Sequence, residues 1–286
     1  MNKPKTLYVS DLDGTLLDVD SHISRRSVDI LNALAEDGAL ITVATARTPA
    51  TVVPLLTGVD IAREVPAVVM TGASMYNRAV SRYEDVSYIP ASDVAHVLDI
   101  CWALGVHPFV YILDKDAGLL RVYHGGGSMN RAEKDFYEER RHLALKHFHL
   151  RTPAPVQALA DTVILFAMGQ QNAVLDVAAR LREETDCYIS AYPDIFNPGI
   201  ANLEILAPGV SKAAAISRLK ARCGAERLVV FGDNLNDIPM LGIADVAVAV
   251  GNAMPEVKAA AHIVIDPNHA DSVARFIRSD YYGMAK

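Results

Sequence analysis

The chain has 286 residues, of which 51% are hydrophobic and 21% are charged, and its formal net charge is −7. This is the composition of a globular protein that can bury one large core or two modest ones. The acidic balance argues against a general nucleic-acid or membrane-surface binder, which would carry a basic footprint. The negative net charge does not exclude an anionic substrate, because a bound cation or a lysine in the site can outweigh it locally.

Three cysteines, Cys101, Cys187 and Cys223, stand far apart and form no CxxC pair or His/Cys cluster. We therefore predict free thiols in a reducing compartment and no zinc site. The N-terminal segment runs into an apolar strand without a signal-peptide pattern, and no apolar run is long enough to span a bilayer. The sequence thus predicts a cytoplasmic protein, a monomer or homodimer, with neither a membrane nor a nucleic acid as partner.

The first part of the chain alternates between strand and helix patterns. The apolar run at 7–9 indicates a buried strand, and Gly14 marks the point where the chain leaves the sheet. Alternation of this kind is typical of a doubly wound parallel sheet. The expected elements are, in order, strand 7–9, helix 24–37 capped by Ser24, strand 39–45, a helix opening at Thr48-Pro49, and strand 66–71.

The middle of the chain has a different rhythm, with more polar, alternating strands and a hairpin around Asp116-Ala117-Gly118. The first rhythm returns from Leu203, where LEILAP reads as a strand of the first sheet and Ser211 caps a helix. The fold class predicted is α/β, a doubly wound, Rossmann-like parallel core with an inserted α+β domain. The predicted boundaries are core 1–81, inserted α+β domain 82–189, and core 190–286.

Four aspartates follow two of the predicted core strands. Asp11 and Asp13 come after strand 7–9, Asp233 comes after strand 228–231, and Asp237 lies four residues further on. Ligands bind at the carboxyl ends of strands in such sheets, and neighbouring carboxylates repel one another unless a cation lies between them. One aspartate after a strand is usually a cap or turn residue, but four at two strand ends predict a Mg²⁺ site.

Two further residues suit a phosphate. Thr45 ends the second strand, where its hydroxyl and the following N–H groups could bind phosphate oxygens. Lys212 opens a helix, where the dipole favours anions, so a lysine there makes sense if an anion is bound. Taken alone, Thr45 is more often an ordinary strand-end residue, and Lys212 is as often a surface lysine.

These residues resemble the haloacid dehalogenase superfamily of aspartate-based phosphotransferases, and within it the Cof-type phosphatases with a large inserted cap. Two positions depart from the subgroup's usual pattern: Ala46 stands in place of Gly, and Thr71 in place of Asn. The segments similar to the four family motifs are DLDGTLL at 11–17, ATAR around Thr45, Val210-Ser211-Lys212, and GDNLND at 232–237.

The resemblance implies a phosphatase that uses Mg²⁺. Asp11 would attack phosphorus and form an aspartyl-phosphate, and Asp13 would protonate the leaving alcohol, then activate water, while its backbone carbonyl binds the metal. Thr45 and Lys212 would hold the phosphoryl oxygens. The implied sets are catalytic Asp11, Asp13, Thr45 and Lys212; metal-binding Asp11, Asp13, Asp233 and Asp237; and substrate-binding Thr45, Arg47, Thr71, Gly72, Lys212 and Asn236.

The expected function is hydrolysis of small phosphorylated metabolites, such as sugar phosphates or nucleotide-like cofactors. Two alternatives stay open: phosphoryl transfer to another alcohol, as in the phosphomannomutases that share this architecture, and a non-catalytic module that binds a phospho-ligand. The presence of Asp11, Asp13, Asp233 and Lys212 argues against the non-catalytic module, since a site no longer used would be expected to have lost some of them. Polar residues in or beside the insert that could contact substrate, but fit ordinary surface or packing positions better, are His124, Asn130, Arg131 and Tyr192.

Overall fold

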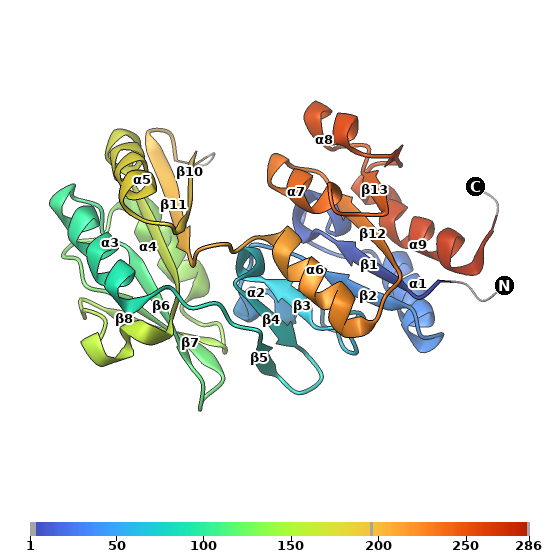
Figure 1. Ribbon diagram of the computed structural model, residues 1–286, viewed down its shortest axis with the longest axis horizontal. Coiled ribbons are helices and arrows are strands. Elements are labelled where there is room, and N and C mark those ends of the chain that lie inside the picture. The colour runs from blue at the N-terminus through green and yellow to red at the C-terminus, as the bar shows by residue number, and fades with distance from the viewer. Residues whose placement is uncertain (1–3, 195–196, 285–286) are drawn as a thin grey trace. The chain divides into compact units, whose positions relative to one another are not determined.

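The structure is a computed structural model that describes residues 4–194 and 197–284. The chain divides into two compact units. The first combines Met1–Glu84 with Ser211–Lys286, and the second is Asp85–Val210. The second unit is therefore an insertion into the first, and Figure 1 shows the helices and strands of both.

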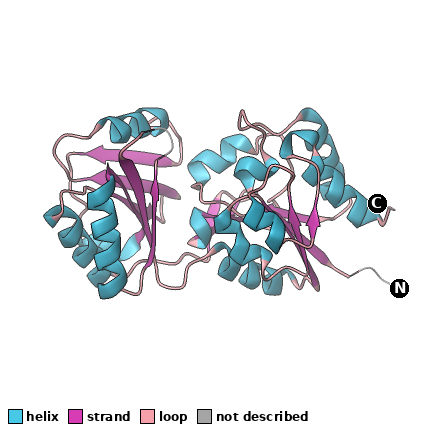
Figure 2. Cartoon of the chain, turned by 90° about the horizontal axis from the view of Figure 1, so that it is seen from above, coloured by secondary structure: helices cyan, strands magenta, loops and turns pink. Residues whose placement is uncertain are grey.

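A five-stranded parallel sheet forms the middle of the first unit (Figure 1), with strand order β14-β13-β12-β1-β2. Strand β1 is buried along nearly its whole length, which requires helices on both of its faces. Figure 2 shows helices flanking these strands. The strands are β1 Thr6–Ser10, β2 Leu40–Val43, β12 Arg227–Gly232, β13 Val246–Ala249 and β14 Ile263–Val264. The predicted parallel core is confirmed.

Two helices of the first unit begin at the serine caps that the sequence predicts. The Ser24 hydroxyl accepts the N–H of Ser27, and the Ser211 hydroxyl accepts the N–H of Ala214 at 3.1 Å. Gly224 ends the second of these helices in the left-handed conformation. The helices are α1 Arg25–Glu36, α2 Pro49–Leu55, α6 Lys212–Cys223, α7 Ile238–Leu241, α8 Pro255–Ala260 and α9 Ser272–Tyr282.

The strand predicted at 66–71 does not take its place in the parallel ladder. Strand β3 (Ala67–Val69) meets the parallel sheet through one bridge, between Ala44 and Val68. It pairs antiparallel with β4 (Ser74–Asn77), which pairs with β5 (Arg82–Glu84). The chain reverses after three strand residues because Met70, Thr71 and Gly72 all have positive φ. A tight turn thus replaces the longer crossover that a parallel neighbour needs.

The second unit is built on a six-stranded sheet of order β10-β11-β9-β6-β7-β8. A Cβ on Gly169 would lie 3.1 Å from Val174 of α5, so α5 covers that face, while Phe136 of α4 packs on Phe166 of the opposite face. Among the described residues of both units, no helix is long and apolar enough to cross a bilayer. The elements are β6 Phe109–Asp114, β7 Leu119–His124, β8 Lys146–Leu150, β9 Thr162–Gln170, β10 Tyr188–Pro193, β11 Ile200–Leu206, α3 Ala91–Ala103, α4 Arg131–Arg140 and α5 Gln171–Glu184.

The inserted unit extends further along the chain than the predicted end at residue 189. Strand β11, which the sequence places in the core, pairs antiparallel with β10 and β9 of the second sheet. The unit therefore ends at Val210 rather than at 189. A buried apolar run such as LEIL identifies a strand but not the sheet to which it belongs, which is why the sequence misplaces it. The α+β character of the insert is confirmed.

Candidate active site

Two aspartates leave neighbouring parallel strands at the same edge of the core sheet. Strands β1 and β12 pair with Ser10 opposite Phe231, so Asp11 and Asp233 both follow strand ends at the carboxyl edge. The N–H of Asp11 donates to the carbonyl of Phe231 at 3.0 Å and extends the pairing by one residue. The parallel register thus brings together two acids that are far apart in the sequence.

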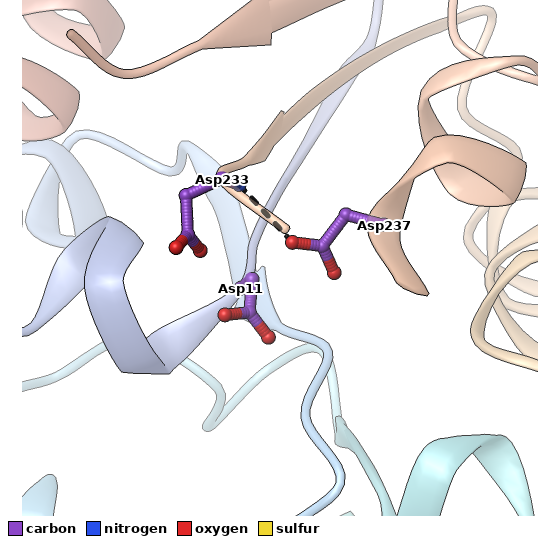
Figure 3. A group of neighbouring side chains, drawn as sticks. All are labelled: Asp11, Asp233 and Asp237. Atoms are coloured by element: carbon purple, nitrogen blue, oxygen red, sulfur yellow. Dashed lines mark hydrogen bonds between the residues drawn. The ribbon is translucent and has the colours of Figure 1, made fainter. Parts of the chain in front are cut away.

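Asp237 completes a cluster of three carboxylates. It lies in the short turn Leu235–Asp237, is fully buried, and accepts the N–H groups of Asp233 and Asn234 at 3.1 and 3.2 Å. Figure 3 shows the side chains of Asp11, Asp233 and Asp237 close together. One carboxylate oxygen from each lies within 4.8 Å of the others. Hard oxygen donors at this spacing fit a Mg²⁺ ion.

The electrostatics of the cluster favour a bound cation. Burial raises the pKa of Asp11 to about 7, although the charge of Lys212 lowers it, and Asp237 and Asp233 raise it further. Burial also raises the pKa of Asp233. A divalent cation in this cluster would stabilise the charged forms of Asp11 and Asp233.

Lys212 joins the nucleophile candidate to Asp237. It is the first residue of α6 and is 4% exposed, and its Nζ donates to Asp11 Oδ1 at 2.6 Å and to Asp237 Oδ1 at 2.8 Å. Burial lowers the pKa of Lys212, but the charges of Asp11 and Asp237 outweigh that effect and hold the pKa above its usual value. The site therefore contains a fixed ammonium group beside Asp11, as a phosphate site needs.

The carboxylate of Asp13 points to a different partner. Its side chain is 51% exposed, and both of its oxygens accept hydrogen bonds from Arg47: Nε to Oδ2 at 2.7 Å and Nη2 to Oδ1 at 2.6 Å. Hydrogen bonding to Asp13 raises the pKa of Arg47. Metal binding through the Asp13 backbone carbonyl stays a prediction, and so does the role of Asn236, whose side chain is exposed beside Asp237.

The turn after Asp11 requires glycine at residue 14. Gly14 has a φ of +76°, and a Cβ there would lie 2.4 Å from Asp233 Oδ2. The next residue, Thr15, is buried and donates its hydroxyl to Asp233 Oδ1 at 2.7 Å. Thr15 thus orients a metal-ligand candidate, and the sequence analysis missed it because its partner lies in the fourth motif, far along the chain.

Thr45 and Thr71 lie together, next to the start of α6. Thr45 is 1% exposed, its hydroxyl accepts the N–H of Arg47 at 3.1 Å, and its carbonyl accepts the N–H of Thr71 at 3.0 Å. Gly72 follows with a φ of +95°, and a Cβ there would lie 2.3 Å from the carbonyl oxygen of Ser211. This close approach places the strand-end turn against the start of α6, the helix that carries Lys212.

The polar residues of the second unit have mostly structural contacts. His124 is buried against the ring of Phe109, with Nε2 3.7 Å from Glu133 Oε1. Asn130 caps α4 through a capping box with Glu133, and Arg131 is an exposed residue of the same helix. Tyr192 of β10 differs, because it is 45% exposed.

Comparison with known proteins identifies the family. A family model described as haloacid dehalogenase-like hydrolase matches residues 8–277. The pyridoxal phosphate phosphatase YbhA of Escherichia coli strain K12 is 27% identical over 281 residues, which cover 94% of this chain and 96% of that protein. The HMP-PP phosphatase of Serratia proteamaculans strain 568 is 25% identical over 254 residues, covering 88% of this chain and 86% of that protein.

The fold is shared with solved structures as well. A haloacid dehalogenase-like hydrolase from Bacteroides thetaiotaomicron superposes with a TM-score of 0.76 at 23% identity, covering 97% of this chain and all of that one. The agreement therefore extends over both units of the chain. The chain belongs to the haloacid dehalogenase-like hydrolases, as a Cof-type phosphatase acting on phosphate monoesters.

Proposed function

We propose that this phosphatase depends on Mg²⁺ and hydrolyses small phosphorylated metabolites through an aspartyl-phosphate formed on Asp11. The observation that carries the proposal is the buried ammonium of Lys212 between Asp11 and Asp237, with Asp233 completing the carboxylate cluster. When bound, Mg²⁺ would offset the repulsion between the Asp11 carboxylate and the phosphate oxygens. Positioning and charge neutralisation then supply most of the catalysis.

The two half-reactions divide between Asp11 and Asp13. An oxygen of Asp11 bonds to phosphorus, the bond to the leaving oxygen breaks, and Asp13 gives that oxygen a proton. In the second half, Asp13 takes a proton from water as the water attacks phosphorus and releases Asp11. Because Arg47 occupies both oxygens of Asp13, a substrate phosphate that takes over the guanidinium would free Asp13 for this work. Arg47 is then a substrate-binding residue.

The proposed substrate class is small phosphorylated metabolites, such as sugar phosphates or nucleotide-like cofactors. Support comes from the two relatives above, whose names specify pyridoxal phosphate and HMP-PP as their substrates. We also propose a reducing, cytoplasmic compartment. All three cysteines are free, and burial raises the pKa of Cys101 to about 12, so this thiol is unreactive.

Asp233→Ala is expected to raise the Mg²⁺ concentration that gives the half-maximal rate by about 10–100-fold, since it removes one oxygen ligand and the partner of Thr15. The measurement is release of p-nitrophenol from p-nitrophenyl phosphate across a Mg²⁺ titration, with EDTA as the metal-free reference. Asp20→Ala, at an exposed aspartate outside the cluster, is the control. An unchanged titration for Asp233→Ala would contradict the assigned ligand set.

The mutase and binding-module alternatives give different products in the same assay. A mutase would convert a sugar phosphate into its isomer with little free phosphate. A binding module would bind Mg²⁺ and release no phosphate from any compound. Phosphate release that requires Mg²⁺ and Asp11 supports the hydrolase over both.

A further inference from the structure

Two asparagines outside the four motifs hold the turn that carries Asp13. Asn252 Nδ2 donates to the carbonyl of Gly14 at 2.7 Å, and Asn268 Nδ2 donates to the carbonyl of Leu17 at 2.7 Å. The two are joined, because Asn252 Oδ1 accepts the backbone N–H of Asn268 at 2.9 Å. We call this pair the asparagine clamp. It is hydrogen-bonded to the turn at residues 12–17 at two points, Gly14 and Leu17.

The clamp is itself fixed to the sheet and to the metal-ligand loop. A Cβ on Gly251 would lie 2.8 Å from the nitrogen of Pro267, so the loops after β13 and β14 touch closely. The N–H of Gly251 donates to the carbonyl of Asp266 at 3.2 Å, and the N–H of Met254 donates to the carbonyl of Asp233 at 2.9 Å. The two asparagines thus belong to loops that are hydrogen-bonded to each other and to the loop of Asp233.

The backbone of the turn is irregular at Asp13 and Gly14, although buried leucines and the hydrogen bond from Thr15 to Asp233 anchor its other residues. Asp13 and Gly14 have non-helical backbone angles, and the bond from the N–H of Leu17 to the carbonyl of Leu12 closes the turn around them at 2.9 Å. Residues in irregular backbone keep one geometry only where the surroundings determine it. Gly14 is the residue directly after Asp13. A hydrogen bond to the Gly14 carbonyl therefore restricts the backbone that orients the Asp13 side chain.

We propose that Asn252 and Asn268 are positioning residues that fix Asp13 relative to Asp11. Both side chains donate to backbone carbonyls of the turn, so the clamp acts through the backbone of the turn. The proposal rests on the proposed function in assigning the proton transfers to Asp13. Displacing a catalytic group by about 1 Å can cost on the order of 10²-fold in rate, so loss of the clamp should appear in kcat.

The test compares Asn252→Ala with a matched control, Asn32→Ala. Asn32 also bridges two backbone groups, donating to the carbonyl of Gly58 at 2.9 Å and accepting the N–H of Asp60 at 2.8 Å, on α1 and away from the site. For Asn252→Ala we expect kcat on glucose 6-phosphate to fall about 10–100-fold with little change in KM. The fall should be smaller on p-nitrophenyl phosphate, whose leaving group needs little protonation.

Two more variants and one readout without turnover complete the design. Asn268→Ala should give the same pattern, and the double variant should lose no more than the worse single variant, because the two asparagines act as one unit. Amide hydrogen exchange of residues 12–17 should accelerate in Asn252→Ala and not in Asn32→Ala.

The outcomes separate the clamp from the phosphatase proposal. An inactive wild type would overturn the proposed function, while hydrogen exchange would still decide whether the clamp holds the turn. A wild type that is active, with Asn252→Ala matching Asn32→Ala in kcat on both substrates, would overturn the clamp. Equal losses on both substrates with unchanged hydrogen exchange of residues 12–17 would also overturn it, because they would indicate damage to the site that does not act through the turn.

Discussion

Asp11→Asn is expected to lower phosphate release by at least about 10³-fold. The amide cannot form the acyl phosphate, and we expect no neighbouring carboxylate to replace Asp11 as the nucleophile. The same variant should unfold at a temperature equal to or above that of the wild type at pH 8 without Mg²⁺. Burial raises the pKa of Asp11 to about 7, so the charged carboxylate is less stable in the fold than in water. An amide of the same shape avoids this cost, although it weakens the hydrogen bond from Lys212.

The pH dependence follows from the direction of that shift. A carboxyl whose pKa is higher in the folded than in the unfolded chain favours the folded state fully below the unfolded pKa. That contribution is lost as pH rises through the folded value. The stability difference between Asp11→Asn and wild type should therefore grow from about pH 4 to about pH 8 and shrink when Mg²⁺ is added. Thermal unfolding at several pH values measures it.

Asp29→Asn, at an exposed position on α1, is the matched control and should change neither activity nor unfolding temperature. Intact mass should be checked before each assay, because deamidation of the new asparagine would restore the nucleophile. Near wild-type turnover by an undamaged Asp11→Asn would remove Asp11 from the nucleophile role. A loss of activity together with a large loss of stability would mean that Asp11 supports the fold.

The strand-end acids illustrate what local pattern can predict. An apolar run that ends in an aspartate marks the carboxyl end of a strand, and parallel strands present those ends at one edge. Asp11 and Asp233 could therefore be expected to meet before any contact was known. The helix start at Lys212 follows in the same way from Ser211, since an N-cap depends on residues three positions apart.

Pairings between distant segments could not be predicted in this way. The paired hydrogen bonds from Arg47 to Asp13 depend on how β1 and β2 are spaced. The hydrogen bond from Asn252 to the Gly14 carbonyl depends on the position of the loop after β13. Nothing in the local sequence distinguishes these side chains from ordinary turn residues. The same limit explains strand β11, whose apolar pattern suits either sheet.

Lys146→Met is expected to stabilise the second unit at neutral and lower pH. Lys146 on β8 is 3% exposed, and its Nζ lies 5.1 Å from the ring centre of Tyr111 and 6.0 Å from that of Phe148. Across residues 4–194 and 197–284, no carboxylate forms an ion pair with it. Burial, with a smaller contribution from the charge of Arg140, lowers the pKa of Lys146 to about 7. The cation–π contacts offset only part of this desolvation.

A lysine whose pKa falls on folding destabilises the fold fully below the folded pKa, and the cost fades as pH rises toward the unfolded value of 10.5. At about pH 6.5, Lys146→Met should therefore raise the free energy of unfolding by roughly 2–5 kcal/mol. Near pH 10 the variant and the wild type should converge. The single tryptophan, Trp102, lies in α3, so its fluorescence during urea unfolding reports on the second unit. Lys134→Met, at an exposed position of α4, should leave the unfolding curve unchanged at both pH values. A Lys146→Met protein no more stable than wild type at pH 6.5 would show that the buried ammonium is stabilised where it lies.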